Sequence, residues 1–245
     1  MGELIAVLSG KGGTGKTSVC AAVATALAQM GESVLCIDCD IGLRNLDISL
    51  GMSQSAALSF LDVCSGGYPL AQAAVHPKYP KLHFLTAPLN CTADQIDRTA
   101  FSDMLKEARK HYRYVFLDAP AGVDAGFRLC AAYADRAILV TGADRASVRD
   151  AGRAGQLLEL MDRSGVRLVV NRVNEKLYAA AGVTVDDVMD EAGLPLLGIV
   201  PEDANVTLAA AFEQPLLSYS KKGAAAAAVR IAKRIQGEPV PITIR

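Results

Sequence analysis

Eight residues near the start of the chain combine glycines with two lysines and a hydroxyl side chain. They fit the pattern G-x-x-x-x-G-K-[ST] and read Gly10, Lys11, Gly12, Gly13, Thr14, Gly15, Lys16 and Thr17. An apolar run at 4–9 precedes them, and apolar residues at helical spacing follow, from Val19 to Met30, before Gly31. Glycines let main-chain N–H groups approach phosphate oxygens, and the positive end of a following helix favours the anion. This arrangement predicts a phosphate-binding loop between a strand and a helix.

Several side chains of this loop have expected tasks of their own. Lys16 should reach the β- and γ-phosphates of a nucleotide, and Ser18 is expected to contact the nucleotide as well. Thr17 offers a hydroxyl to Mg²⁺, a cation that keeps several waters and takes few protein ligands. Lys11 is not required by the general pattern, and by itself it could be a solvated loop lysine.

Carboxylates follow two other apolar runs of the chain. Asp38 and Asp40 lie at the end of the second run, and Asp118 ends the fourth. Because the carboxyl ends of parallel strands meet at one edge of a sheet, we expect these carboxylates beside the phosphate-binding loop. Asp118 is expected to hold the metal, with Asp38 in its outer shell and Asp40 orienting the attacking water. Turn formation and capping are the alternative, since Asp commonly does both at strand ends.

The elements that must position these side chains are seven short apolar runs separated by stretches that include helical periodicity. Strands that are apolar throughout indicate a mostly parallel sheet covered on both faces. The predicted fold is therefore α/β and doubly wound, as one domain over 1–237 with a short Pro-containing tail at 238–245. The alanine run at 223–228 is expected to start a last helix. The seven predicted strands are 4–9, 33–38, 82–87, 114–118, 136–141, 166–171 and 195–200.

Composition excludes several classes of protein. Hydrophobic residues make up 51% of the 245-residue chain, so a large core can form, and the formal charge of -1 gives no global field for nucleic acid. The N-terminal sequence has no pattern typical of an export signal, which favours a cytoplasmic location. Cys36 and Cys39 form one CxxC pair, but no second pair has the spacing of a structural zinc site, so reduced thiols are expected.

The motifs together resemble the deviant Walker A ATPases of the ParA/MinD family, which have a P-loop NTPase fold. The loop with its extra Lys11 carries the resemblance, as do IDCDIGLRNLD, FLDAPAG, SVRD at 147–150 and VVNRV. The similarity covers nearly the whole chain and implies an ATPase that uses ATP and Mg²⁺. It also implies an ATP-dependent homodimer in which each Lys11 reaches the phosphates of the partner's nucleotide. Residues implied to enclose the adenine are Asn171, Arg172, Pro201, Glu202 and Asp203.

The MinD branch of this family implies a role in cell division. Its ATP-bound dimer positions the division septum by recruiting a MinC-like inhibitor at the inner face of the cell membrane, in some cases with a MinE-like activator. Members commonly end in an amphipathic anchor helix, whereas Pro239 and Pro241 disfavour a helix in the tail here. Weak membrane binding by this chain is therefore expected.

Three alternatives share parts of the pattern. A ParA-type partitioning ATPase would bind DNA, and Arg145, Arg149 and Arg153 do lie on one helical face. Acidic residues lie close to them, which favours a protein partner over nucleic acid. A flagellar-number regulator of the same branch stays open. An ATP-gated iron–sulfur reductase would need exposed thiolates, and Cys91 and Cys130 are poor candidates because Cys130 lies in an apolar helical stretch.

Overall fold

The computed structural model describes residues 1–243, so positions 244 and 245 of the expected tail lie outside the described residues. An eight-stranded sheet of order β3-β4-β2-β5-β1-β6-β7-β8 forms its centre. The strand pairs are parallel, except that β3 and β4 are antiparallel. The strands are β1 (Glu3–Leu8), β2 (Val34–Asp38), β3 (Ala74–Val75), β4 (Leu82–Leu85), β5 (Tyr114–Asp118), β6 (Arg136–Thr141), β7 (Val166–Val173) and β8 (Leu196–Pro201).

The doubly wound α/β prediction is confirmed, and each of the seven predicted strands is present within a few residues of its expected bounds. The prediction of only seven strands was wrong, because β3 adds an eighth. This strand has two residues and pairs only with the edge of β4. A two-residue strand is too short to produce a periodic pattern, which explains why the sequence did not reveal it.

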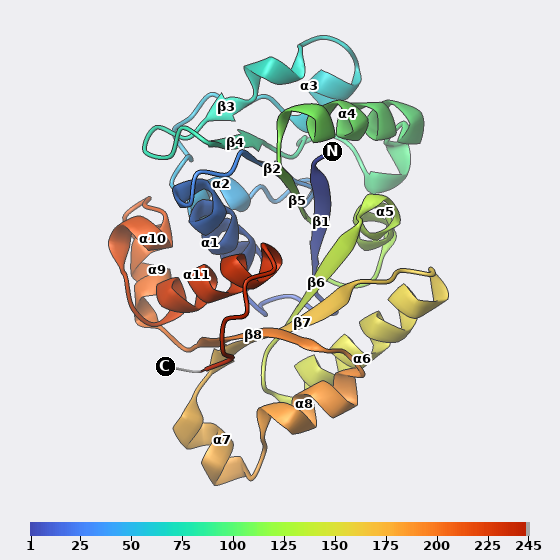
Figure 1. Cartoon of the computed structure of the whole chain (residues 1–245). Helices are drawn as coiled ribbons and strands as arrows, with labels where there is room; N and C mark the ends of the chain where they lie inside the picture. The colour runs from blue at the N-terminus through green and yellow to red at the C-terminus, as the bar shows by residue number, and fades with distance from the viewer. Residues whose placement is uncertain (244–245) are drawn as a thin grey trace.

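Helices cover both faces of the sheet (Figure 1). One face carries α1 (Lys16–Gln29) and α11 (Ala224–Ile235), with α2 (Leu46–Leu50), α9 (Ala204–Ala211) and α10 (Leu216–Tyr219) around them. The other face carries α4 (Arg98–His111), α5 (Ala125–Tyr133), α6 (Arg145–Leu160) and α8 (Val185–Ala192). The remaining helices are α3 (Phe60–Cys64), α7 (Glu175–Ala181) and the 3-10 turns η1 (Leu70–Gln72) and η2 (Ala93–Gln95).

Each central strand contributes side chains to two separate cores. In β1, Ile5 and Val7 pack toward α1 and α11, whereas Ala6 and Leu8 pack into the opposite core. Successive side chains of a strand point to opposite faces, so a strand buried on both faces must be apolar throughout. This requirement accounts for the continuous apolar runs of the sequence.

The helix α1 is almost fully buried between the sheet and α11. Its small residues allow this close approach, and Gly31, with a φ of +95°, follows the last turn as expected. The last helix α11 begins in the predicted alanine run, and its alanines pack against α1. Burial of α1 on all sides fixes the direction of its N-terminus, which is where the phosphate-binding loop joins it.

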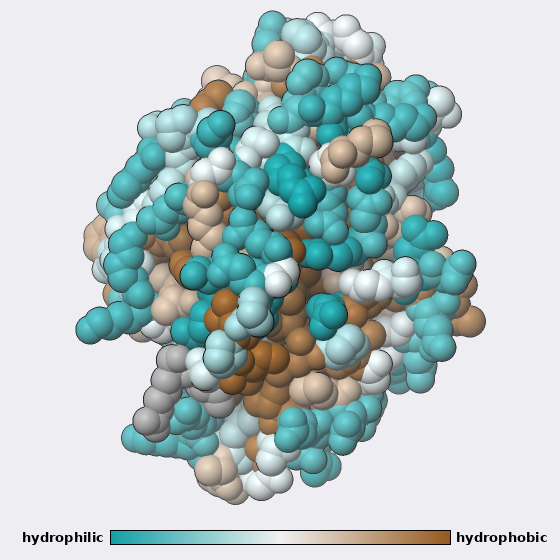
Figure 2. Space-filling model, viewed as in Figure 1, coloured by the Kyte–Doolittle hydropathy of each residue, from teal (hydrophilic) through white to brown (hydrophobic). Residues whose placement is uncertain are grey.

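The described part of the tail stays in contact with the domain. Arg234 donates from Nε to the Val240 carbonyl at 2.9 Å and from Nη1 to the Leu197 carbonyl of β8 at 2.9 Å. Figure 2 shows apolar surface gathered around β8, the last strand of the sheet. Within residues 1–243, no helix has the length and hydropathy needed to cross a membrane. The proposed division at residue 237 stays a prediction.

Candidate functional site

The loop after β1 has the geometry of an anion cradle. Gly13 and Gly15 have φ values of +80° and +85°, a region that favours glycine. Gly15 is the N-cap of α1 and supplies no side chain to cap it, so the first N–H groups of the helix stay available to an anion. A Cβ on Gly10 would lie 2.3 Å from the Asp150 carbonyl oxygen of α6, so only glycine fits there.

Lys16 and Asp118 form a buried ion pair at the centre of the site. Lys16 Nζ lies 2.7 Å from Asp118 Oδ1, and the two side chains are only 6% and 1% exposed. Burial acts to lower the pKa of Lys16, but the charge and hydrogen bond of Asp118 outweigh it and raise that pKa. Burial also raises the pKa of Asp118, although Lys16 opposes the shift. The prediction that Asp118 lies beside the loop is therefore correct in position.

Asp38 and Asp40 follow β2 at the same edge of the sheet. Asp38 Oδ1 accepts the Asp40 N–H at 2.9 Å, and Oδ2 accepts the Leu46 N–H at 3.2 Å. Burial, helped by the charge of Asp118, raises the pKa of Asp38 to about 7. Burial also raises the pKa of Asp40, against the effect of Lys16. Asp38 thus holds both ends of the loop that carries Asp40, which is the turn-forming role that the sequence left open as the alternative.

The donor set beside Lys16 suits a small hard cation. Burial raises the pKa of both Asp38 and Asp118, and the charge of Asp118 adds to the shift of Asp38, so a divalent cation would stabilise the charged forms of these carboxylates. Asp118 Oδ2 is buried without a well-oriented hydrogen-bond partner within 1–243, and the Thr17 hydroxyl lies close enough to favour the charged carboxylate. Over the same residues, no group of three or more His, Cys, Asp or Glu side chains is arranged around a common metal position. Mg²⁺ is such a small hard cation, and it keeps several waters and takes few ligands from protein.

Lys11 points away from this cluster and toward α6. Its Nζ lies 3.2 Å from Asp144 Oδ1, and the side chains are 38% and 59% exposed. Hydrogen bonds from Ser147, followed by the contact with Lys11, lower the pKa of Asp144 to about 2. Asp144 is the N-cap of α6, which the D-x-x-S spacing could have indicated. Its pairing with Lys11 joins residues 133 positions apart and was not predicted.

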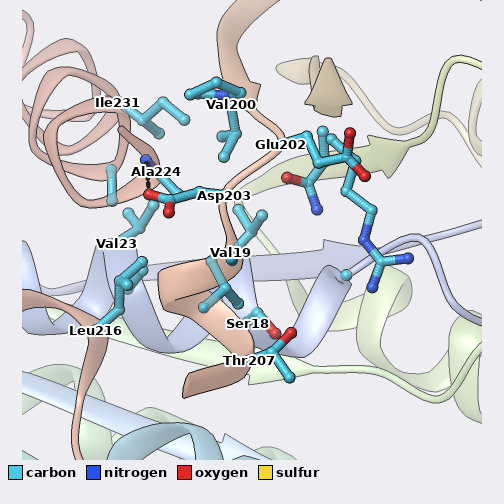
Figure 3. Close-up of a pocket in the computed structure, with 18 residues that line it drawn as sticks. Ser18, Val19, Val23, Val200, Glu202, Asp203, Thr207, Leu216, Ala224 and Ile231 are labelled. Atoms are coloured by element: carbon cyan, nitrogen blue, oxygen red, sulfur yellow. Dashed lines mark hydrogen bonds between the residues drawn. The ribbon is translucent and has the colours of Figure 1, made fainter. Parts of the chain in front are cut away.

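A cavity of about 390 Å³ opens next to the end of the loop (Figure 3). Apolar side chains form much of its wall, among them Val19, Val23, Val200, Leu216 and Ile231. The flat ring of a nucleobase, which has a few polar groups at its edges, matches such a lining. The cavity brings together seven of the predicted binding residues, namely Gly15, Ser18, Asn171, Arg172, Pro201, Glu202 and Asp203.

Two acidic residues of this group hold the cavity wall in place. Asp203 accepts the Asn205 N–H at 2.9 Å and the Ala224 N–H at 3.0 Å, and so caps both α9 and α11 (Figure 3). Glu202 Oε2 accepts the Asn174 side-chain amide at 2.9 Å. The Asp203 carboxylate therefore accepts backbone N–H groups in this structure. Its contact with a nucleobase stays a prediction. Asn174, which directly follows the predicted VVNRV segment, was not predicted to hold Glu202.

Comparison with known proteins identifies the family. Residues 5–216 match the CobQ/CobB/MinD/ParA nucleotide binding domain. The septum site-determining protein MinD of Synechocystis is 36% identical over 98% of this chain and 92% of its own length. MinD in the MinC:MinD cell division complex of Aquifex aeolicus superposes with a TM-score of 0.91 at 33% identity, covering 98% of each chain. MinD of Pyrococcus horikoshii, solved with Mg-ADP, gives 0.83 at 25% identity over 96% of each.

The matched region includes the segments of the chain that form the site. The family match over residues 5–216 includes the loop, the strand-end carboxylates and most of the cavity wall, and the similar chains align over almost their full length. The chain belongs to the CobQ/CobB/MinD/ParA family of nucleotide-binding proteins, and its relatives within that family include the septum site-determining MinD proteins.

Proposed function

We propose that the chain is a Mg²⁺-dependent ATPase of the MinD type, converting ATP to ADP and phosphate. The observation that carries this proposal is the continuity between the anion cradle, the buried Lys16–Asp118 pair and the adjoining apolar cavity. One nucleotide would occupy all three, with its phosphates on the loop and its base in the cavity. The Mg-ADP complex of the Pyrococcus horikoshii relative supports the same ligand class.

Each predicted residue then has a defined task. The loop N–H groups and Lys16 bind the phosphates, and the Asp118 carboxylate with the Thr17 hydroxyl would hold Mg²⁺, with Asp38 behind them. The cation, when bound, supplies charge that neutralises the phosphate oxygens. Asp40 is less buried than Asp38 and is placed by the N–H bond to Asp38, which suits it to orient water.

Lys11 is assigned to a second copy of the chain. Its pair with Asp144 is exposed, and such pairs contribute little stability, so the lysine can exchange Asp144 for an anion at little cost. In an ATP-bound homodimer it would reach the phosphates held by the partner subunit and stabilise charge that develops during transfer.

The cellular role that we propose is placement of the division septum. The ATP-bound dimer would recruit a MinC-like inhibitor, as the MinC:MinD complex of the Aquifex relative suggests, and a MinE-like activator would reset it. A peripheral location at the inner face of the cell membrane belongs to the same proposal. Co-sedimentation with anionic vesicles, with and without ATP, tests that location separately.

Phosphate release tests the enzymatic part of the proposal. Purified wild-type chain with Mg-ATP should release phosphate, and Lys16→Ala should abolish both release and nucleotide binding. Lys106→Ala, on the exposed surface of α4, is a matched control that should change neither. Equal release by wild type and Lys16→Ala would contradict the proposal. A pull-down with ATP-trapped Asp40→Ala then tests for the MinC-like partner.

A further inference from the structure

The strand β7 contains an irregularity next to the cavity. Val170 pairs with Ile199 of β8, and the next pair is Val173 with Pro201. Between these two pairs β7 therefore contains one more residue than β8. The extra residue lies in the pair Asn171–Arg172, and Arg172 has a φ of +56°, which non-glycine residues rarely adopt. Such bulges interrupt pairing and redirect side chains, often near functional sites.

The interrupted pairing leaves the Asn171 side chain against the phosphate-binding loop. Its Nδ2 donates to the Thr14 carbonyl at 2.8 Å, a contact that joins residues 157 positions apart. Asn171 is 6% exposed and Thr14 is 5% exposed, so water has little access to this bond. A Cβ built on Gly15 would lie 2.2 Å from Nδ2, which shows how tightly the amide packs on the loop.

This hydrogen bond fixes the orientation of one peptide plane. The Thr14–Gly15 peptide is trans, and in a trans peptide the C=O and the next N–H point in opposite directions. With the Thr14 carbonyl held toward Asn171, the Gly15 N–H is held toward the opposite side. That N–H belongs to the loop proposed to bind phosphate. Asn171 also lines the cavity proposed for the base, so one side chain faces both halves of the site.

We propose that Asn171 is a positioning residue that couples the base cavity to the phosphate-binding loop. The inference rests on the proposed nucleotide function and goes beyond a contact with the base. The NH₂ group of the Asn171 side chain must face Thr14, because the Thr14 carbonyl oxygen only accepts hydrogen bonds. The amide oxygen is then the atom available to an amino group of a base. Loss of the side chain would therefore weaken binding of a phosphate chain that carries no base.

The test compares two ligands on the full chain, Mg-tripolyphosphate and a Mg complex of a non-hydrolysable ATP analogue. Titration calorimetry gives each affinity for wild type, Asn171→Ala and Asn171→Asp. We expect Asn171→Ala to weaken tripolyphosphate binding by about tenfold, since a buried carbonyl loses its donor. Asn171→Asp should weaken it at least as much, because an ionised carboxylate cannot donate. Asn90→Ala, on the exposed loop after β4, is the control and should bind both ligands normally.

The outcomes separate this inference from the proposed function. If Asn171→Ala weakens only the ATP analogue and leaves tripolyphosphate unchanged, Asn171 is a base contact alone and the inference is wrong. If wild type binds neither ligand, the proposed function fails and the inference fails with it. Affinities are measured per folded, binding-competent chain, and each variant is compared with wild type for each ligand separately. A general loss of stability therefore does not imitate the expected result.

Discussion

Removing the lysine of the buried ion pair should strongly destabilise the nucleotide-free protein. Lys16→Met keeps the length of the aliphatic side chain but deletes the charge that Asp118 contacts at 2.7 Å. Asp118, at 1% exposure, would then be an uncompensated buried carboxylate. Breaking a buried pair from one side costs about 3–5 kcal/mol, which for a chain of this size corresponds to a Tm decrease of roughly 6–20 °C.

Calorimetry without nucleotide measures this effect directly. Lys106→Met is the matched control, because Lys106 and Asp103 also lie 2.7 Å apart but their side chains are 67% and 63% exposed. Water screens that pair, so its loss should leave the Tm nearly unchanged. Adding Asp118→Asn to Lys16→Met should recover much of the lost stability by removing the unpaired charge. If Lys16→Met costs no more than Lys106→Met, the buried pair does not carry the stability assigned to it.

Three further changes should have distinct effects. Lys11→Ala should still bind nucleotide but stay monomeric with ATP and fail to hydrolyse it, and a normal ATP dimer in sedimentation would refute its assignment to a second chain. Asp40→Ala should lower turnover and leave ATP affinity nearly unchanged, whereas a joint fall would indicate a role in binding. Burial lowers the pKa of His76, and its Nδ1 accepts the N–H groups of Lys78 and Tyr79. The neutral imidazole therefore stabilises the fold at pH values above the ordinary histidine pKa, and this stability is lost as the pH falls. In urea unfolding, the free energy of unfolding should fall less between pH 7.5 and pH 5.5 for His76→Gln than for wild type. Equal decreases would contradict this prediction.

The sequence predicted the fold and the centre of the site because both depend on local patterns. Apolar runs of strand length, separated by stretches with helical periodicity, indicated a covered parallel sheet. That topology brings the ends of β1, β2 and β5 to one edge. The glycines of the loop follow from a backbone requirement that is visible in the residue types. Because β1 and β5 end at the same edge of the sheet, Asp118 could be placed beside Lys16 although 102 positions separate them.

Features that depend on side-chain geometry between distant segments could not be predicted. The pairing of Lys11 with Asp144 and the bond from Asn171 to Thr14 have no spacing signal. Asp203 was expected at a base, yet its position before α9 also made it a helix cap, and the second helix that it caps begins 21 residues later. The extra residue in β7 depends on its register with β8, which a single strand pattern does not contain.

In the proposed function, one Mg-nucleotide occupies the loop and the cavity together. A crystal structure of the chain with Mg²⁺ and a non-hydrolysable ATP analogue tests it most directly. We expect the triphosphate on the loop from Gly10 to Thr17, with Lys16 turned from Asp118 toward the phosphates and the base beside Asn171. A nucleotide bound elsewhere, or phosphates on the loop with the base outside the cavity, would contradict it.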